Sequence, residues 1–146
     1  MPPTPITDQL SVSGQITRED IAAFAKEGYG TIINNRPDGE EPGQLTNEEA
    51  AAEAAKHGLE YRYIPIVTNT MTRRDVVAHQ HAVLRGRQKV LAYCRSGTRC
   101  YLLWAANRVL YEGESAVKIV AEAALKGYDL RVLPRLIEKL EAEPAP

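Results

Sequence analysis

The sequence is poor in cysteine and in net charge, and each shortage excludes a class of protein. Only two of its 146 residues are cysteine, and both lie in one short segment, so the cysteines do not form a disulfide framework of the secreted kind. The formal net charge is −1 at pH 7, so no overall basic surface attracts nucleic acid or an anionic membrane. Any attraction for anions must therefore depend on a few local residues.

Long apolar runs are also missing. No run approaches the ~20 residues that a transmembrane helix needs, and residues 1–5 contain neither the basic nor the apolar part of a signal peptide. We therefore expect no membrane and no nucleic-acid partner, and a cytoplasmic location, where reducing conditions suit a free thiol. Residues 1–146 are expected to form a single domain, with an extended arm over 1–8 and a flexible tail over 142–146.

Strand-type and helix-type segments alternate along the chain. Strands are predicted at residues 10–13, 31–34, 60–66 and 89–93. Helices are predicted after the capping pairs Thr17 with Asp20, Thr46 with Glu49 and Thr72 with Asp75, and again from Cys100, Ser115 and Pro134. This alternation predicts an α/β fold with a short, mostly parallel central sheet flanked by helices, in which sites lie beyond the carboxyl ends of the strands.

The most informative segment runs from the strand at 89–93 into a polar loop and a second apolar helix. The strand delivers Cys94 into the loop, and Arg99 closes it five residues later. Loop N–H groups and a helix N-terminus can converge on an anion, and the same field lowers the pKa of a thiol. Cys94 is therefore predicted to be the nucleophile and Arg99 the anion clamp. The rest of the predicted anion site is Arg95, Ser96, Gly97, Thr98 and Cys100.

The loop from Cys94 to Arg99 resembles the active loop of rhodanese-type sulfurtransferases and, more loosely, the phosphate loop of cysteine-dependent phosphatases. Together with segments 32–40 and 63–66, it makes nearly the whole chain similar to one bacterial family. That family is known both as the phosphatase-like domain of beta-lactamase hydrolase-like proteins and as a sulfurtransferase family. The resemblance implies a fold like that of protein-tyrosine and dual-specificity phosphatases, and it implies no cofactor.

Three departures from the phosphatase pattern favour sulfur chemistry. Four residues separate Cys94 from Arg99 where phosphatases place five, and Cys100 stands where their arginine falls. Dual-specificity phosphatases have an aspartate after an Ile-Pro strand end, and the segment 64–69 has no carboxylate there. Tyr93 replaces the usual histidine. The first hypothesis is therefore a sulfurtransferase that forms a Cys94 persulfide from a small anionic donor, thiosulfate or a low-molecular-weight persulfide, and needs no general acid.

Two other hypotheses remain open. The chain can be a protein-tyrosine-phosphatase-like hydrolase of phosphate esters, with Cys94 as nucleophile and Asp38, in the turn 36–39, as general acid. The turn chemistry of this segment favours a structural role, in which Asp38 bonds local N–H groups. Alternatively, the chain is a non-catalytic anion-binding or redox-sensing module in which Cys100 pairs with Cys94. The simpler role for Cys100 is that of a small buried residue.

The remaining charged and histidine residues carry weaker predictions. Glu40 and Glu41 are placed to pair with Arg36 or Arg99. His79 and His81 lie two apart on a helix and face different directions, so we expect them to be exposed or partly buried rather than metal ligands. No metal site is expected, because the cysteines lack the usual ligand spacing. Related domains occur joined to metallo-β-lactamase-like sulfur enzymes, so such an enzyme is an expected partner.

Overall fold

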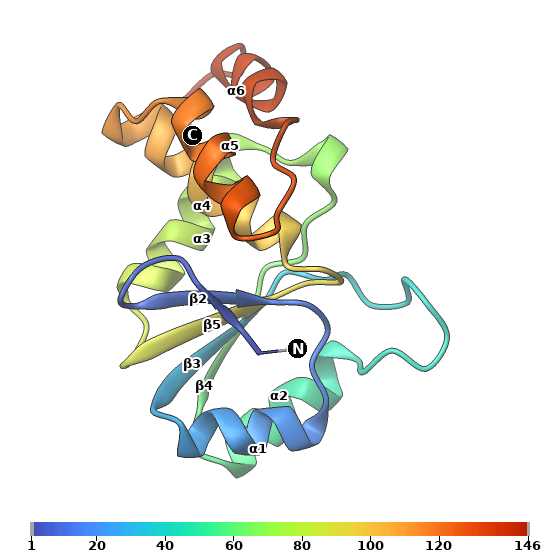
Figure 1. Cartoon of the computed structure of the whole chain (residues 1–146). Helices are drawn as coiled ribbons and strands as arrows, with labels where there is room; N and C mark the ends of the chain where they lie inside the picture. The colour runs from blue at the N-terminus through green and yellow to red at the C-terminus, as the bar shows by residue number, and fades with distance from the viewer. Residues whose placement is uncertain (1, 146) are drawn as a thin grey trace.

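A five-stranded sheet forms the centre of the computed structural model, which describes residues 2–145 (Figure 1). Met1 and Pro146, the outermost residues of the predicted arm and tail, lie outside that range. The strands are β1 (Thr4–Pro5), β2 (Leu10–Ser13), β3 (Tyr29–Asn34), β4 (Glu60–Tyr63) and β5 (Lys89–Tyr93). Their order is β1-β2-β5-β3-β4, and only the β1–β2 pair is antiparallel. The predicted mostly parallel sheet is confirmed, and part of the predicted arm is its short edge strand β1.

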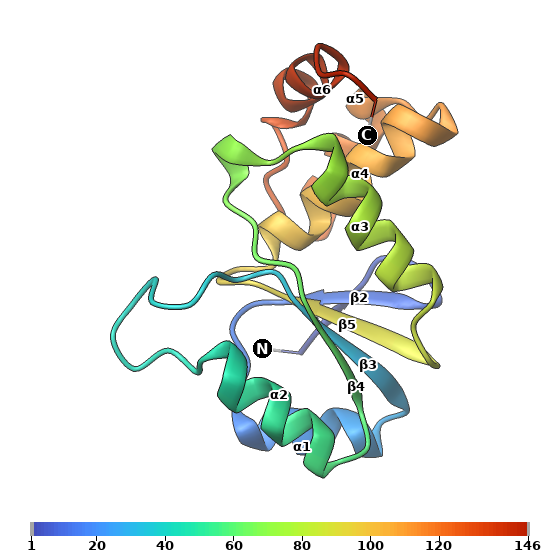
Figure 2. The ribbon, with the colours of Figure 1, turned by 180° about the vertical axis from the view of Figure 1, so that it is seen from behind.

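Helices cover both faces of this sheet (Figures 1 and 2). On one face lie α1 (Arg18–Lys26) and α2 (Asn47–Lys56). On the other lie α3 (Arg73–Leu84), α4 (Thr98–Glu112), α5 (Ala116–Leu125) and α6 (Leu133–Glu141), with a short 3-10 turn, η1 (Thr68–Thr70), before α3. Within residues 2–145, the helices are all too short or too polar to cross a membrane.

The first three helices begin where their capping residues predict. Thr17, Thr46 and Thr72 each accept a hydrogen bond from the backbone N–H three residues further on. The carboxylate of the acidic residue at that position accepts a hydrogen bond from the backbone N–H of the threonine in each case. Local side-chain chemistry therefore sets these helix starts, before any packing is considered.

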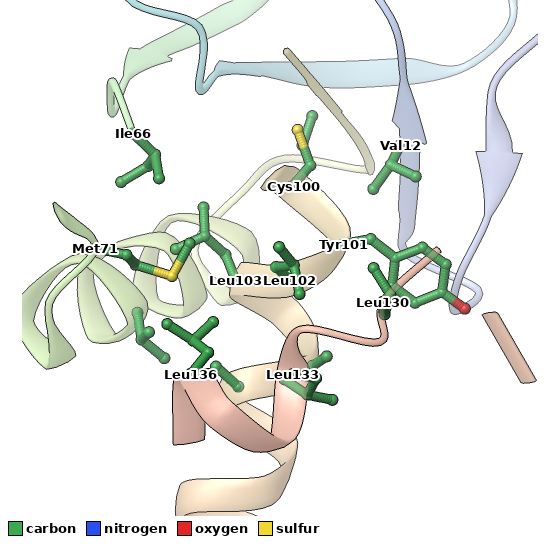
Figure 3. Packing of buried hydrophobic residues seen from close by; sticks show 14 of the residues in the cluster. Val12, Ile66, Met71, Cys100, Tyr101, Leu102, Leu103, Leu130, Leu133 and Leu136 are labelled. Carbon is green, nitrogen blue, oxygen red and sulfur yellow. The ribbon is translucent and has the colours of Figure 1, made fainter. Parts of the chain in front are cut away.

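Two hydrophobic clusters fill the layers on either side of the sheet. The larger lies between the sheet and helices α3 to α6 and contains Cys94. Its members Cys100 and Leu103 are shown in Figure 3. The smaller lies under α1 and α2 and contains Tyr93. Because successive residues of a strand point to opposite faces, Tyr93 and Cys94 separate into different clusters at the end of β5. Cys94 is thereby directed toward the start of α4.

His79 corrects one expectation from the sequence. It is fully buried, and neither ring nitrogen has a hydrogen-bond partner among residues 2–145. His79 falls in phase with Val76 and Val83, three and four residues away, which form the buried stripe of α3. Burial lowers the pKa of His79 to about 4, so the imidazole is neutral at pH 7.

The predicted flexible tail is attached to the domain at one point. Glu143 Oε2 accepts a hydrogen bond from the backbone N–H of Arg73 at 3.1 Å. The Arg73 guanidinium donates a second bond to the backbone carbonyl of Glu143 at 3.3 Å. The segment after α6 is therefore held against the start of α3.

Candidate active site

The loop between β5 and α4 forms the candidate active site. Cys94 follows β5, a strand flanked by parallel neighbours on both sides, and is fully buried at the carboxyl end of the sheet. Gly97 caps α4, which begins at Thr98, two residues before the predicted start at Cys100. The loop is therefore short, and its backbone N–H groups lie at the positive end of a 15-residue helix.

Gly97 is required by the shape of this loop. Its φ is 93°, in the left-handed region that side chains rarely adopt. A Cβ atom there would lie 2.7 Å from the hydroxyl of Tyr128 and 3.3 Å from the backbone of Ser13. The turn brings the N–H of Gly97 to 3.1 Å from Cys94 Sγ, so the backbone donates directly to the thiol.

The environment of Cys94 stabilises its thiolate. The largest contribution is a hydrogen bond from the thiol of Cys100, and the backbone N–H groups of Cys100 and Ser96 and the charge of Arg99 add to it. These groups outweigh burial, which opposes ionisation, and lower the pKa of Cys94 to about 5 from its ordinary 9.0. Cys94 is consequently a thiolate at neutral pH, as the sequence predicted.

Titration of the thiols offers a direct test of this arrangement. We expect the ultraviolet absorbance of the Cys94 thiolate to appear as the pH rises through about 5. Because ionisation is easier in the folded than in the unfolded state, it stabilises the fold fully above the ordinary pKa, and this contribution is lost as the pH falls toward 5. The difference between wild type and Cys94→Ser isolates the signal. A midpoint near 9 would contradict the arrangement described.

Cys100 lies beside Cys94, in the first turn of α4. It is fully buried and belongs to the larger hydrophobic cluster (Figure 3). Burial raises the pKa of the Cys100 thiol well above its ordinary value, and the negative charge of Cys94 raises it further. Cys100 therefore remains a protonated donor to Cys94, and it presents no surface to a substrate.

Arg99 lies beside the thiolate and is held by a carboxylate. Its two terminal nitrogens contact the two oxygens of Glu40, each at 2.8 Å, and one of them also donates to the carbonyl of Ile66 at 2.9 Å. The hydrogen bond from Arg99 is the main reason that the pKa of Glu40 falls to about 2. Glu40 is thus ionised at neutral pH and occupies both terminal nitrogens of Arg99.

A second arginine fixes Glu40 in place. Arg36 is completely buried and contacts Glu40 at 2.8 Å, Glu41 at 3.1 Å and the side-chain oxygen of Gln15 at 3.0 Å. The expected pairing of these glutamates with Arg36 and Arg99 is confirmed. Because Arg36 is buried and bound by two carboxylates, it fixes the position of the loop that follows β3.

The Asp38 carboxylate bonds outside its own turn. Its Oδ1 accepts a hydrogen bond from the backbone N–H of Asn47, the first residue of α2, at 2.7 Å. Its own N–H donates to the hydroxyl of Tyr63 at 3.1 Å. Asp38 therefore stabilises the start of α2, and a role as general acid requires its carboxyl to leave Asn47.

The outer side of the loop carries the remaining predicted residues. The Arg95 side chain is 65% exposed and lies 3.9 Å from Glu41. The hydroxyl of Ser96 donates to that of Thr98 at 3.0 Å. Sequence reasoning did not assign Gln15 to the site, although its backbone N–H donates to the Arg95 carbonyl at 3.2 Å. Its position in the sequence could have indicated this, because Gln15 comes just after β2. Strand β2 runs parallel to β5, so both strands end at the same edge of the sheet.

An activated cysteine after a central parallel strand, a glycine-turned loop and an arginine in the first helical turn define the class of cysteine-dependent, phosphatase-like α/β domains. Residues 4–111 match the family model described as "Beta-lactamase hydrolase-like protein, phosphatase-like domain". The chain belongs to this family, as its motifs predicted. Helices α5 and α6 lie outside the matched residues.

Individual relatives agree with this assignment. A beta-lactamase hydrolase-like protein of Xylella fastidiosa is 37% identical over 125 residues, which are 86% of this chain and 29% of that protein. The chain thus spans less than a third of this relative. A candidate phosphatase of Neisseria meningitidis has a solved structure with a TM-score of 0.83 and 32% identity, covering 92% of this chain and 95% of that one.

More distant structures share the fold. P. aeruginosa TpbA in complex with pTyr superposes with a TM-score of 0.60 and 15% identity, covering 97% of this chain and 91% of that chain. The predicted fold of the protein-tyrosine and dual-specificity phosphatases is therefore confirmed.

Proposed function

We propose that this chain hydrolyses small phosphate monoesters, with Cys94 as nucleophile and Arg99 as anion clamp. The observation that carries the proposal is the Cys94 thiol, whose pKa is about 5, at the N-terminus of α4 in a phosphatase-like fold. The family description and the solved complex of TpbA with pTyr support a phosphate ester as the substrate class. These comparisons favour the phosphatase hypothesis over the sulfurtransferase that the sequence placed first.

The proposed reaction proceeds in two displacements at phosphorus. The Cys94 thiolate attacks, a sulfur–phosphorus bond forms, and the ester phosphorus–oxygen bond breaks. Backbone N–H groups of residues 95–98 and the guanidinium of Arg99 stabilise the charge on the phosphoryl oxygens. The leaving oxygen takes a proton from the carboxyl of Asp38 once that carboxyl has left Asn47. Water then gives a proton to the ionised Asp38 and attacks the phosphorus, a phosphorus–oxygen bond forms and the sulfur–phosphorus bond breaks. This step releases phosphate and restores both the thiolate and the Asp38 carboxyl.

Sulfur transfer is the second candidate, and a specific observation favours it. Glu40 is ionised by its arginine partners and Asp38 is bound to Asn47, so no carboxyl described at the site is poised to give a proton. The Cys94 thiolate would attack the outer sulfur of thiosulfate, the sulfur–sulfur bond would break, and sulfite would leave with its electron pair. A thiophilic acceptor would then take the sulfur from the persulfide. A metallo-β-lactamase-like sulfur enzyme is the partner that fits this candidate.

A paired assay separates these candidates. We expect the purified protein to release phosphate from an aryl phosphate and to form no thiocyanate from thiosulfate and cyanide. Asp38→Asn keeps an oxygen that accepts the Asn47 N–H, so the fold is preserved, and it is expected to lower the rate for esters with poor leaving groups by about 10²-fold or more. Asp8→Asn, in an exposed turn, is the matched control.

Each other outcome identifies a different function. Thiocyanate formation without phosphate release would contradict the proposal and establish sulfur transfer. If neither product forms, the non-catalytic or redox-sensing interpretation replaces both.

A further inference from the structure

A pocket of about 530 Å³ lies next to Arg99, between the η1 segment and helix α6. Apolar side chains of Val67, Val132 and Leu136 form much of its lining, and Lys139 and Arg135 extend it along α6. Val67 and Val132 are 47% and 42% exposed, so they present apolar surface to whatever enters. The pocket can therefore accommodate an apolar group of about the size of an aromatic ring.

The charged side chains that line this pocket are all basic, and Arg99 among them is paired with Glu40 outside the lining. Arg99, Arg135 and Lys139 line it, and no acidic side chain of residues 2–145 does. Arg135 and Lys139 are exposed and lie one turn apart on the same face of α6. Lys139 donates to the carbonyl of Asn69 at 2.7 Å, which holds its ammonium at the pocket, and Arg135 has no ion pair within the described chain. Such a site attracts an anion as well as an apolar group.

Arg99 connects this pocket to the nucleophile. The guanidinium that lines the pocket comes from the first turn of α4, directly after the Cys94 loop. Its pKa is raised mainly by the hydrogen bonds to Glu40 and further by the charge of the Cys94 thiolate. A substrate whose reacting anion is at Cys94 can therefore extend past Arg99 toward α6. Because α6 lies beyond the residues matched by the family model, the pocket adds a recognition element that the family assignment does not describe.

We propose that the pocket binds the body of the substrate, with an apolar segment against Val67, Val132 and Leu136 and a second anionic group on Arg135 and Lys139. The substrate class is then a phosphate monoester of an aryl or short alkyl alcohol that bears a carboxylate or a second phosphate at its far end. This inference rests on the proposed function for the group at Cys94, and it goes further by naming the substrate class.

Two esters and one double variant test the inference. The probes are phenyl phosphate and its analogue with a carboxylate on a short alkyl spacer in the para position. We expect the carboxylate to lower KM in the wild type, and Arg135→Gln with Lys139→Gln to raise KM for the carboxylate ester by about tenfold with kcat unchanged. KM for phenyl phosphate is expected to stay the same. Lys118→Gln, an exposed lysine on α5 that does not line the pocket, removes one charge elsewhere as the control.

A binding measurement separates this inference from the proposed function. The unreactive phosphonate analogue of the carboxylate ester is titrated into Cys94→Ser protein and into the same protein with the double substitution. Weaker binding in the second protein supports the pocket even if no ester is hydrolysed, in which case only the proposed function fails. The proposed role of the pocket would be contradicted if the analogue bound the two proteins equally or bound neither. It would also be contradicted if the double substitution raised KM equally for both esters.

Discussion

Cys94→Ser is expected to lower kcat/KM for aryl phosphate hydrolysis by at least about 10³-fold. The cysteine is a thiolate at neutral pH because its pKa is about 5, whereas a serine hydroxyl at the same position stays protonated. The loop positions no free carboxylate or neutral imidazole to take the proton of the serine, since Glu40 is bound to two arginines and Asp38 accepts a hydrogen bond from Asn47. Steady-state kinetics with a chromogenic ester measure this loss.

Cys100→Ser serves as a comparison for Cys94→Ser, because it changes the neighbouring thiol and leaves Cys94 in place. The serine hydroxyl still donates toward Cys94, so we expect a loss of no more than about tenfold. Thermal unfolding of both variants near the wild-type temperature would show that the fold is intact. Hydrolysis by Cys94→Ser protein at the wild-type rate would show that phosphate release does not pass through Cys94.

Arg99→Ala is expected to lower kcat/KM by about 10²- to 10³-fold. Removing the guanidinium takes away a donor to the phosphoryl oxygens and a positive charge that lowers the pKa of Cys94. It also leaves Glu40 with one arginine partner in place of two, which adds negative charge beside the incoming anion. The loss in kcat/KM and an upward shift in the thiol titration are therefore expected together.

Two further variants show whether the geometry of Arg99 accounts for this effect. Arg99→Ala combined with Glu40→Gln is expected to recover part of the lost activity, because the uncompensated carboxylate is removed. Arg95→Ala is expected to lose less than about tenfold, since Arg95 is mostly exposed and lies 3.9 Å from its nearest carboxylate. Equal losses for Arg95→Ala and Arg99→Ala would contradict the role assigned to Arg99.

Local chemistry accounts for the parts of the fold that could be predicted. The reciprocal bonds of Thr17, Thr46 and Thr72 involve residues three apart, so the helix starts are visible in the sequence. The start of α4 was missed by two residues, because its cap is Gly97 with a positive φ and no side chain to reveal it. The burial of His79 was missed because a polar residue gives no sign of burial in the sequence. Its burial is evident only from the packing of the apolar stripe of α3.

The same distinction between local and tertiary contacts applies to the site. Cys94, the loop and Arg99 are contiguous, so their meeting could be predicted. Gln15 reaches the site from the segment after β2, and the carbonyl of Ile66 reaches it from the segment after β4. The order of strands in the sheet brings both to the site. The hydrogen bond that the Asp38 carboxylate accepts comes from Asn47, nine residues further along the chain. Such contacts follow from tertiary structure, which short motifs do not encode.

The carboxylate of Glu40 makes the site selective before any substrate arrives. It occupies both nitrogens of the guanidinium in the geometry that a bound oxyanion would use, and Arg36 keeps it there. An internal ligand of this kind acts at a high effective concentration. We therefore expect ambient anions such as chloride or bicarbonate to compete poorly, and a dianion that also gains the loop N–H groups to displace the carboxylate. On this view Glu40 excludes weakly binding anions from the thiolate.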